Sequence, residues 1–215
     1  MSQTFWARYG KRCFDALVAG LLLLLLSPVF LLTAILVALT SPGPVFFFQD
    51  RAGRGGCPFR IYKFRTMRGG RKPDPHEIVP LNHSEITPVG WWLRRLKIDE
   101  LPQLYNVLRG DMSLVGPRPT LPDQAAAYDD FRRQRLLVRP GISGLAQIHG
   151  NASISWDERI LFDVAYVACC SFLLDMSILA QTILVVFGGE TRHVVDFRTT
   201  RYASRIEIPD GFGST

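Results

Sequence analysis

A predominantly apolar stretch, residues 14–39, restricts the folding of this chain more than any other feature of its sequence. It contains an unbroken run of leucines from Leu21 to Leu26. As a helix rising about 1.5 Å per residue, the stretch would reach roughly 39 Å, which exceeds the roughly 30 Å thickness of a bilayer's hydrocarbon core. This segment must therefore meet lipid or a very dry protein core.

A proline near the middle of the stretch predicts a break. Because Pro28 lacks a backbone donor and clashes with the preceding turn, the helix should bend at Ser27-Pro28. Lys and Arg mark the cytoplasmic side of a membrane, so basic residues on both flanks favour two ends on that side. We therefore expect residues 1–40 to form a re-entrant helix-break-helix membrane anchor, with a kinked spanning helix as the alternative. The basic residues are Arg8, Lys11 and Arg12 before the stretch and Arg51, Arg54, Arg60, Lys63, Arg65 and Arg68 after it.

The composition narrows the choice of partners. Of the 215 residues, 47% are hydrophobic, which is enough for one domain in addition to the anchor. A net charge of +6 would suit nucleic acid, an anionic membrane or a phosphate-rich substrate, but we recognise no nucleic-acid-binding motif. The four cysteines lack C-x-x-C spacing and metal-ligand pairing with histidine. We expect reduced thiols, a cytosolic face and no nucleic-acid partner, with Cys13, Cys169 and Cys170 as packing residues.

The remaining pattern predicts the α+β class, with a folded domain over residues 41–187 and a polar C-terminal tail over residues 188–215. Turn residues separate the anchor from a β-rich segment, and short helical patterns follow. The expected elements are a small β-hairpin of residues 45–49 and 59–64, a short amphipathic helix opened by Trp91-Trp92, a short helix over 101–108, a longer helix over 122–138 and an interfacial amphipathic helix over 172–187.

Asp99 and Glu100 are the residues that most suggest chemistry. Since Pro102 is tolerated in the first turn of a helix, the acids are expected at a helix N-terminus. Acids there can simply cap the helix, and this explanation suffices for the pair taken alone. Adjacent carboxylates repel each other, however, and would suit a divalent cation such as Mg²⁺. The nearby Arg94 would keep a carboxylate ionised and hold a diphosphate against it, as a nucleophilic carboxylate requires.

Two later segments contain candidate binding residues. Arg118 lies between Pro117 and Pro119, which restrict its backbone and would direct its guanidinium for bidentate phosphate recognition. An exposed arginine on a rigid turn is the equal alternative. The segment from Arg139 to Gln147 contains small residues, which would let its backbone approach a flat ligand closely.

The sequence motifs of this chain, taken in their order and number, resemble those of the bacterial sugar transferase family, the monotopic phosphoglycosyl transferases. The resemblance is to the short form of the family, which consists of the catalytic domain alone. The resemblance runs from about Lys11 to about Phe187. Its motifs are Lys-Arg-Cys-Phe-Asp from residue 11, Ser27-Pro28, Ser41-Pro42-Gly43-Pro44, Tyr62-Lys63-Phe64-Arg65-Thr66-Met67, Ile98-Asp99-Glu100-Leu101-Pro102-Gln103, Gly116-Pro117-Arg118-Pro119 and Arg139-Pro140-Gly141.

The resemblance implies transfer of a sugar-1-phosphate from a UDP-sugar to polyprenyl (undecaprenyl) phosphate. Asp99 would attack the sugar-linked phosphate, release UMP and carry a covalent phosphosugar intermediate, and Asp99 and Glu100 would hold Mg²⁺. The chain would lie in the bacterial inner membrane with its catalytic domain on the cytoplasmic face, and assembly with a second copy is left open. The implied binding residues are Arg94, Arg118 and Lys63 for phosphates and Arg139, Gly141 and Gln147 for the nucleotide.

The sequence departs from the family pattern at Ala168-Cys169-Cys170, where more polar residues are expected before Ser171. The loop from Arg68 to Pro80 matches little of the pattern and is a candidate for sugar specificity. Two rival functions are a membrane-anchored scaffold without catalysis, which would not need Asp99, and a lipid-phosphate hydrolase with water as acceptor. No histidine is placed as the base that such a hydrolase would need.

Overall fold

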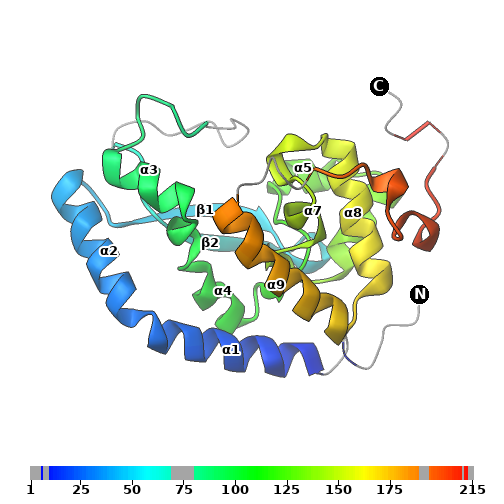
Figure 1. The fold of residues 1–215 in the computed structure, drawn as a ribbon, viewed down its shortest axis with the longest axis horizontal. Helices are drawn as coiled ribbons and strands as arrows, with labels where there is room; N and C mark the ends of the chain where they lie inside the picture. The colour runs from blue at the N-terminus through cyan, green and yellow to red at the C-terminus, as the bar shows by residue number, and fades with distance from the viewer. Residues whose placement is uncertain (1–5, 7–9, 69–79, 189–193, 210, 213–215) are drawn as a thin grey trace.

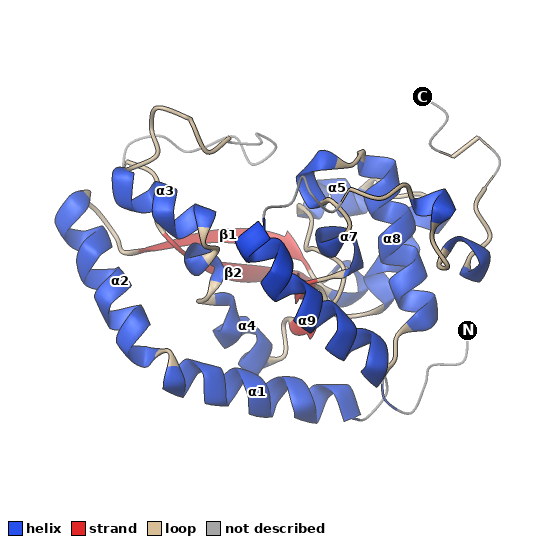
Figure 2. Ribbon diagram, in the orientation of Figure 1, coloured by secondary structure: helices blue, strands red, loops and turns tan. Residues whose placement is uncertain are grey.

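The computed structural model describes residues 6, 10–68, 80–188, 194–209 and 211–212, and it confirms the predicted α+β class. Helices dominate, and the sheets are small (Figure 2). Arg8 and residues 69–79 of the predicted specificity loop lie outside the described residues. The N-terminal helices α1 (Lys11–Leu25) and α2 (Ser27–Thr40) form a curved arm around one side of the molecule (Figure 1).

The arm is bent where the sequence predicted a break. Leu26 separates α1 from α2, and the two axes differ in direction by 60°. Pro28 cannot donate to the carbonyl of Leu24, and the hydroxyl of Ser27 donates to that carbonyl instead, at 2.8 Å. Ser27 therefore satisfies the acceptor that Pro28 leaves open. Within the described part of the chain, no individual helix has both the length and the apolarity of a membrane span, whereas this bent pair together has both.

The arm presents apolar side chains outward and is tied to the domain by polar ones. Asp15 is buried and accepts a hydrogen bond from the backbone N–H of Leu114. Arg12 donates to the carbonyl oxygens of Val107 and Leu108, each at 2.6 Å. The leucines of the arm that are more than half exposed are Leu17, Leu21, Leu24, Leu25, Leu31, Leu32 and Leu39.

The predicted hairpin is confirmed, with longer strands than expected. Strands β1 (Phe46–Ala52) and β2 (Pro58–Phe64) pair antiparallel, and a short 3₁₀ turn, η2 (Arg54–Gly56), connects them. Asn106 binds β2 from the side, because its side chain accepts from the N–H of Tyr62 and donates to the carbonyl of Arg60. The hairpin lies inside the curve of the arm (Figure 1).

The segments that follow the hairpin form short helices, two of which the sequence predicted. Helix α3 (Pro88–Arg95) begins three residues before Trp91. Helix α4 (Gln103–Arg109) corresponds to the helix predicted over residues 101–108 but begins two residues later. Between them lies the 3₁₀ turn η3 (Ile98–Glu100). The acid pair therefore belongs to a separate turn that precedes α4 rather than to the helix itself.

The single helix predicted over residues 122–138 is wrong. The segment consists of α5 (Pro122–Ala126), α6 (Asp130–Arg133) and the 3₁₀ helix η4 (Gln134–Leu137). Asp129 explains the interruption, because its carboxylate leaves the helical path and caps α6 by accepting from the N–H of Arg132 at 2.7 Å.

A parallel pair of short strands was not predicted. It is formed by β3 (Ser113–Val115) and β4 (Gly141–Ser143), which lie far apart in sequence. The remaining short elements are α7 (Leu145–Ile148), η5 (Asn151–Ser153), η7 (Phe197–Thr199) and η8 (Ala203–Arg205).

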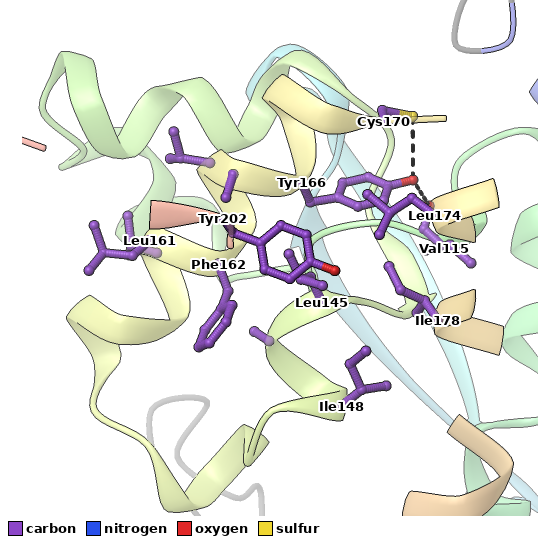
Figure 3. Close-up of a cluster of buried hydrophobic side chains, with 14 of the residues drawn as sticks. Val115, Leu145, Ile148, Leu161, Phe162, Tyr166, Cys170, Leu174, Ile178 and Tyr202 are labelled. Carbon is purple, nitrogen blue, oxygen red and sulfur yellow. Dashed lines mark hydrogen bonds between the residues drawn. The ribbon is translucent and has the colours of Figure 1, made fainter. Parts of the chain in front are cut away.

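The main core lies between α8 (Trp156–Cys169), α9 (Phe172–Gly188) and α7, and Tyr166 occupies its interior (Figure 3). The phenol of Tyr166 donates to the buried carboxylate of Asp175 at 2.7 Å. The predicted helix over residues 172–187 is confirmed, and its place at a lipid interface stays a prediction. Residues from the tail also enter this core, namely Phe197, Tyr202 and Phe212.

The four cysteines, all among the described residues, form no disulfide. Cys170 is buried and Cys169 is half-buried, as expected of packing residues. The prediction that Cys13 packs inside is wrong, because it lies on the outward face of α1 and is exposed.

Candidate active site

The acid pair lies in the buried turn η3, between α3 and α4. Lys97, with a positive φ of 57°, ends α3 and turns the chain into η3. Asp99 and Glu100 are only 8% and 9% exposed, which is unusual for two adjacent acids. A pair that served only as a helix cap would remain in water, so its burial needs partners of opposite charge.

Glu100 has those partners. Its Oε1 accepts from Nζ of Lys63 at 2.8 Å and from Nη2 of Arg118 at 2.6 Å. Nη1 of Arg118 donates to Oε2 at 3.3 Å, which makes the contact bidentate. Burial alone would raise the pKa of Glu100, but Arg118 and Lys63 together hold it well below its ordinary value of 4.5. Glu100 is therefore ionised.

Asp99 differs from its neighbour. Its Oδ1 is buried and has no hydrogen-bond partner among the described residues. Burial and the adjacent charge of Glu100 raise the pKa of Asp99 from 3.8 to about 6, against the opposing effect of Lys63 and two further cations. The two acids are thus divided by their environment, and Asp99 has an unused oxygen in a cationic surrounding.

Helix α3 brings Arg94 to the same place. The side chain of Thr87 caps α3 by accepting from the N–H of Gly90 at 2.8 Å. Gly90 lies so close to the main chain of Thr66 that a Cβ there would be 2.0 Å from its carbonyl oxygen. This approach allows Nε of Arg94 to donate to the hydroxyl of Thr66 at 2.8 Å. Burial lowers the pKa of Arg94, and Asp99 and Glu100 act against this decrease.

Sequence reasoning missed Arg135, which fixes the position of Arg118. The side chain of Arg135 is 2% exposed and donates to the main-chain oxygen of Arg118 at 2.9 Å. It also forms a buried ion pair with Asp163 at 2.5 Å and donates to the hydroxyl of Tyr128. No local pattern distinguishes Arg135 from the other charged residues of this segment, so only the packing could identify it.

Arg51 was also missed as a site residue. Burial, together with the charge of Arg118, lowers the pKa of Arg51 to about 10, while Glu100 opposes this shift. Arg51 therefore lies within electrostatic range of both. Alternation along the hairpin could have shown this, because residues 47, 49 and 51 share the face of β1 that is paired with Lys63.

The structure thus brings Lys63, Arg94, Arg118 and the acid pair together, but it does not join the second predicted group to them. Nε of Arg139 donates to the carbonyl of Gly110, and Gln147 donates to the carbonyl of Ile142. Gly141 packs on Gly116, and a Cβ at Gly141 would lie 2.1 Å from the backbone nitrogen of Gly116. Among the described residues, these three make no hydrogen bond to the acid pair, and their binding of a nucleotide stays a prediction.

The donors around Asp99 are compatible with Mg²⁺ but do not form a complete protein cage. No cluster of three or more His, Cys, Asp or Glu residues suited to a metal occurs in the described ranges. Mg²⁺ is commonly held by one or two carboxylates together with substrate phosphates. The unpaired Oδ1 of Asp99 and the adjacent carboxylate of Glu100 provide this kind of hard oxygen donor.

Comparison with known proteins identifies relatives over most of the chain. The chain is 45% identical to "Uncharacterized sugar transferase EpsL" of Bacillus subtilis (strain 168) over 194 residues, which cover 88% of this chain and 95% of that protein. It is 45% identical over 185 residues to the "UDP-N-acetylgalactosamine-undecaprenyl-phosphate N-acetylgalactosaminephosphotransferase" of Aeromonas hydrophila. It is 40% identical over 198 residues to the "UDP-glucose:undecaprenyl-phosphate glucose-1-phosphate transferase" of Escherichia coli (strain K12).

The relatives from Aeromonas hydrophila and Escherichia coli are longer proteins than this chain. The match covers 83% of this chain and 44% of the Aeromonas protein, and 86% of this chain and 42% of the Escherichia protein. The family profile described as "Bacterial sugar transferase" matches residues 6–189, a range that contains the arm, the hairpin and the acid pair. The chain therefore belongs to the bacterial sugar transferase family and is an enzyme of the phosphoglycosyl transferase type.

Proposed function

We propose that this enzyme transfers a sugar-1-phosphate from a UDP-sugar to undecaprenyl phosphate, as the first membrane step in the synthesis of a glycoconjugate. The named relatives use substrates of these two classes. The observation that carries the proposal is the division of the acid pair. Glu100 is held by two cations, whereas Asp99 keeps a buried, unpaired oxygen beside them.

The reaction has two displacement steps. The carboxylate of Asp99 attacks the sugar-linked phosphorus, the bond from that phosphorus to the bridging oxygen breaks, and UMP leaves. The enzyme then carries a phosphosugar on Asp99. A phosphate oxygen of undecaprenyl phosphate attacks the same phosphorus, and the bond to Asp99 breaks. The products are undecaprenyl diphosphate sugar and the regenerated carboxylate.

The cations around the pair suit this chemistry. Arg118 and Lys63 are already oriented by Glu100, so they can stabilise charge on phosphate oxygens without reorganisation. Arg94, fixed by Thr66, approaches from the side of α3. Asp99 and Glu100 would hold Mg²⁺, which supplies charge neutralisation to the diphosphate when it is bound.

The bent arm supports a re-entrant attachment to the inner membrane with both ends on the cytoplasmic side. Its leucines point outward, and its two helices meet at a 60° bend. At the bend the hydroxyl of Ser27 donates to the carbonyl of Leu24, so this carbonyl needs no water, which the hydrocarbon core of a membrane lacks. Such an arm would hold the acid pair at the level where a soluble nucleotide sugar and a membrane lipid can meet.

The direct test is a half-reaction. Purified enzyme is incubated with UDP-sugars and Mg²⁺ without lipid, UMP is quantified, and peptides are analysed by mass spectrometry. We expect at most one equivalent of UMP and a phosphosugar on the peptide that contains Asp99. Asp99→Asn should give neither. Full lipid-dependent transfer by that variant would exclude Asp99 as the nucleophile, and UMP release only when lipid is present would indicate direct transfer.

A further inference from the structure

An aromatic groove opens beside the acid pair. Its volume is about 240 Å³, and it lies between the membrane arm, the hairpin and α4. Rings line it throughout: edge-to-face contacts join Phe48 to Tyr62 at 5.2 Å and Tyr62 to Tyr105 at 5.4 Å between ring centroids. The lining residues are Phe30, Phe46, Phe48, Tyr62, Pro102 and Tyr105.

The hairpin separates this groove from the cationic site. Successive residues of a strand point to opposite faces, so Lys63 and Tyr62 diverge. Lys63 reaches Glu100, whereas Tyr62 and its partner in β1, Phe48, line the groove. The face with Lys63 therefore borders the cationic site. The opposite face contributes the rings of Phe48 and Tyr62 to the groove, beyond which lies the exposed Asp50–Arg60 ion pair.

The groove ends close to the acid pair at Pro102 and borders the arm at Phe30. Pro102 follows Glu100 by two residues, so at 3.8 Å per step their Cα atoms are within about 8 Å of each other. At the other side, Phe30 belongs to α2, next to Leu31 and Leu32, which are 64% and 58% exposed. A molecule in the groove would thus touch the apolar arm and end close to the catalytic acids.

We propose that this groove holds the first isoprene units of the lipid phosphate acceptor and so directs its phosphate toward Asp99. This inference rests on the proposed function. At about 240 Å³ the groove is smaller than pockets for whole drug-sized ligands, which span roughly 300 to 1,000 Å³, so the rest of the chain would remain in the bilayer. A nucleotide base fits less well, because no charged or amide side chain lines the groove to recognise its edge.

The test separates the two substrates by their KM values. Phe48 is 46% exposed and can be changed without opening the core. Phe48→Ser should raise the KM for undecaprenyl phosphate in detergent micelles about tenfold and leave the KM for the UDP-sugar unchanged. Phe48→Leu, which keeps an apolar side chain, should restore most of the affinity. Phe187→Ser is the matched control, since Phe187 is 73% exposed on α9 and lies outside the groove.

Each other pattern would overturn the inference. A rise in the UDP-sugar KM without rescue by leucine would assign the groove to the nucleotide. An equal effect of Phe187→Ser would indicate only general membrane contact, and no change in Phe48→Ser would exclude the groove.

Photocrosslinking tests binding independently of turnover, with a polyprenyl phosphate that carries a diazirine in its first isoprene unit. Crosslinks to β1 or to Tyr105 support the groove even if the wild type transfers no sugar phosphate, in which case the proposed function alone fails. Crosslinks confined to other segments would refute the groove.

Discussion

Nη2 of Arg118 lies 2.6 Å from Oε1 of Glu100, and this contact separates the roles of two adjacent acids. Arg118 and Lys63 form ion pairs with Glu100 and lower its pKa, so this carboxylate stays ionised although the turn is buried. The negative charge of Glu100 raises the pKa of Asp99, whose Oδ1 accepts no hydrogen bond from the described residues.

The pKa of Asp99, raised to about 6, predicts the acid limb of the pH profile. A carboxylate must be ionised to attack phosphorus, so kcat/KM should increase with pH up to about 6 and then level off. The measurement is UMP release at low UDP-sugar concentration between pH 4.5 and 8. A profile without an inflection in this range would contradict the assigned nucleophile.

Asp99→Asn should be inactive yet more stable than the wild type at neutral pH. The carboxyl group of Asp99 binds its proton more tightly in the folded protein than in the unfolded chain. Its protonated form therefore stabilises the fold fully below pH 4, and this contribution is lost as the pH rises through about 6. A difference of about 2 pKa units corresponds to about 3 kcal/mol. Thermal unfolding of both proteins in detergent at pH 7.5 and pH 4 measures this difference in stability. If Asp99→Asn were as much more stable than the wild type at pH 4 as at pH 7.5, the raised pKa of Asp99 would not explain the difference.

Arg118→Gln should reduce kcat/KM by about 10- to 100-fold, the value of a charge-assisted hydrogen bond. Its loss should also raise the pKa of Glu100, because the strongest opposing charge is removed. Arg118→Lys should recover only part of the activity, since an ammonium cannot form the bidentate contact. The control is Arg60→Gln, where a 3.5 Å ion pair with Asp50 is 64% exposed on both sides and should change activity less than twofold.

Gly90→Ala should displace α3 and with it Arg94. A Cβ at this position would meet the carbonyl oxygen of Thr66 at 2.0 Å, and backbone cannot yield as a flexible side chain does. We expect unfolding to become easier by about 1 to 3 kcal/mol and activity to fall with it. Gly20→Ala is the control, because its nearest neighbour is 3.8 Å away and alanine favours the helix. Equal melting temperatures for both variants would show that α3 tolerates the shift.

Two native cysteines allow the topology to be measured. Cys13 is exposed at the start of α1, and Cys57 is exposed in the connection of the hairpin, so the two flank the bent arm. A re-entrant arm predicts that a membrane-impermeant maleimide reaches both from the cytoplasmic side of inverted vesicles and neither from the outside of intact cells. Labelling of the two cysteines from opposite sides would establish a spanning helix.

Local features of the fold were predictable where their causes are local. The bend at Ser27-Pro28 follows from the missing donor of proline, and the hairpin follows from two β-rich segments on either side of the glycines at 53, 55 and 56. The helix predicted over residues 122–138 failed because Asp129 competes with the helix for backbone N–H groups, and sequence periodicity does not show which conformation wins.

The sequence by itself determined the apolar arm, its break, the hairpin and the acid pair, because each depends on residues that are neighbours along the chain. Only the tertiary structure decided which acid is paired and which keeps an unpaired oxygen. It also brought Arg135 to the main chain of Arg118, and it placed Phe30 of the arm against the rings of the hairpin. These relationships join segments far apart in sequence, and burial and charge act through space, so their outcome is fixed only when the chain is packed.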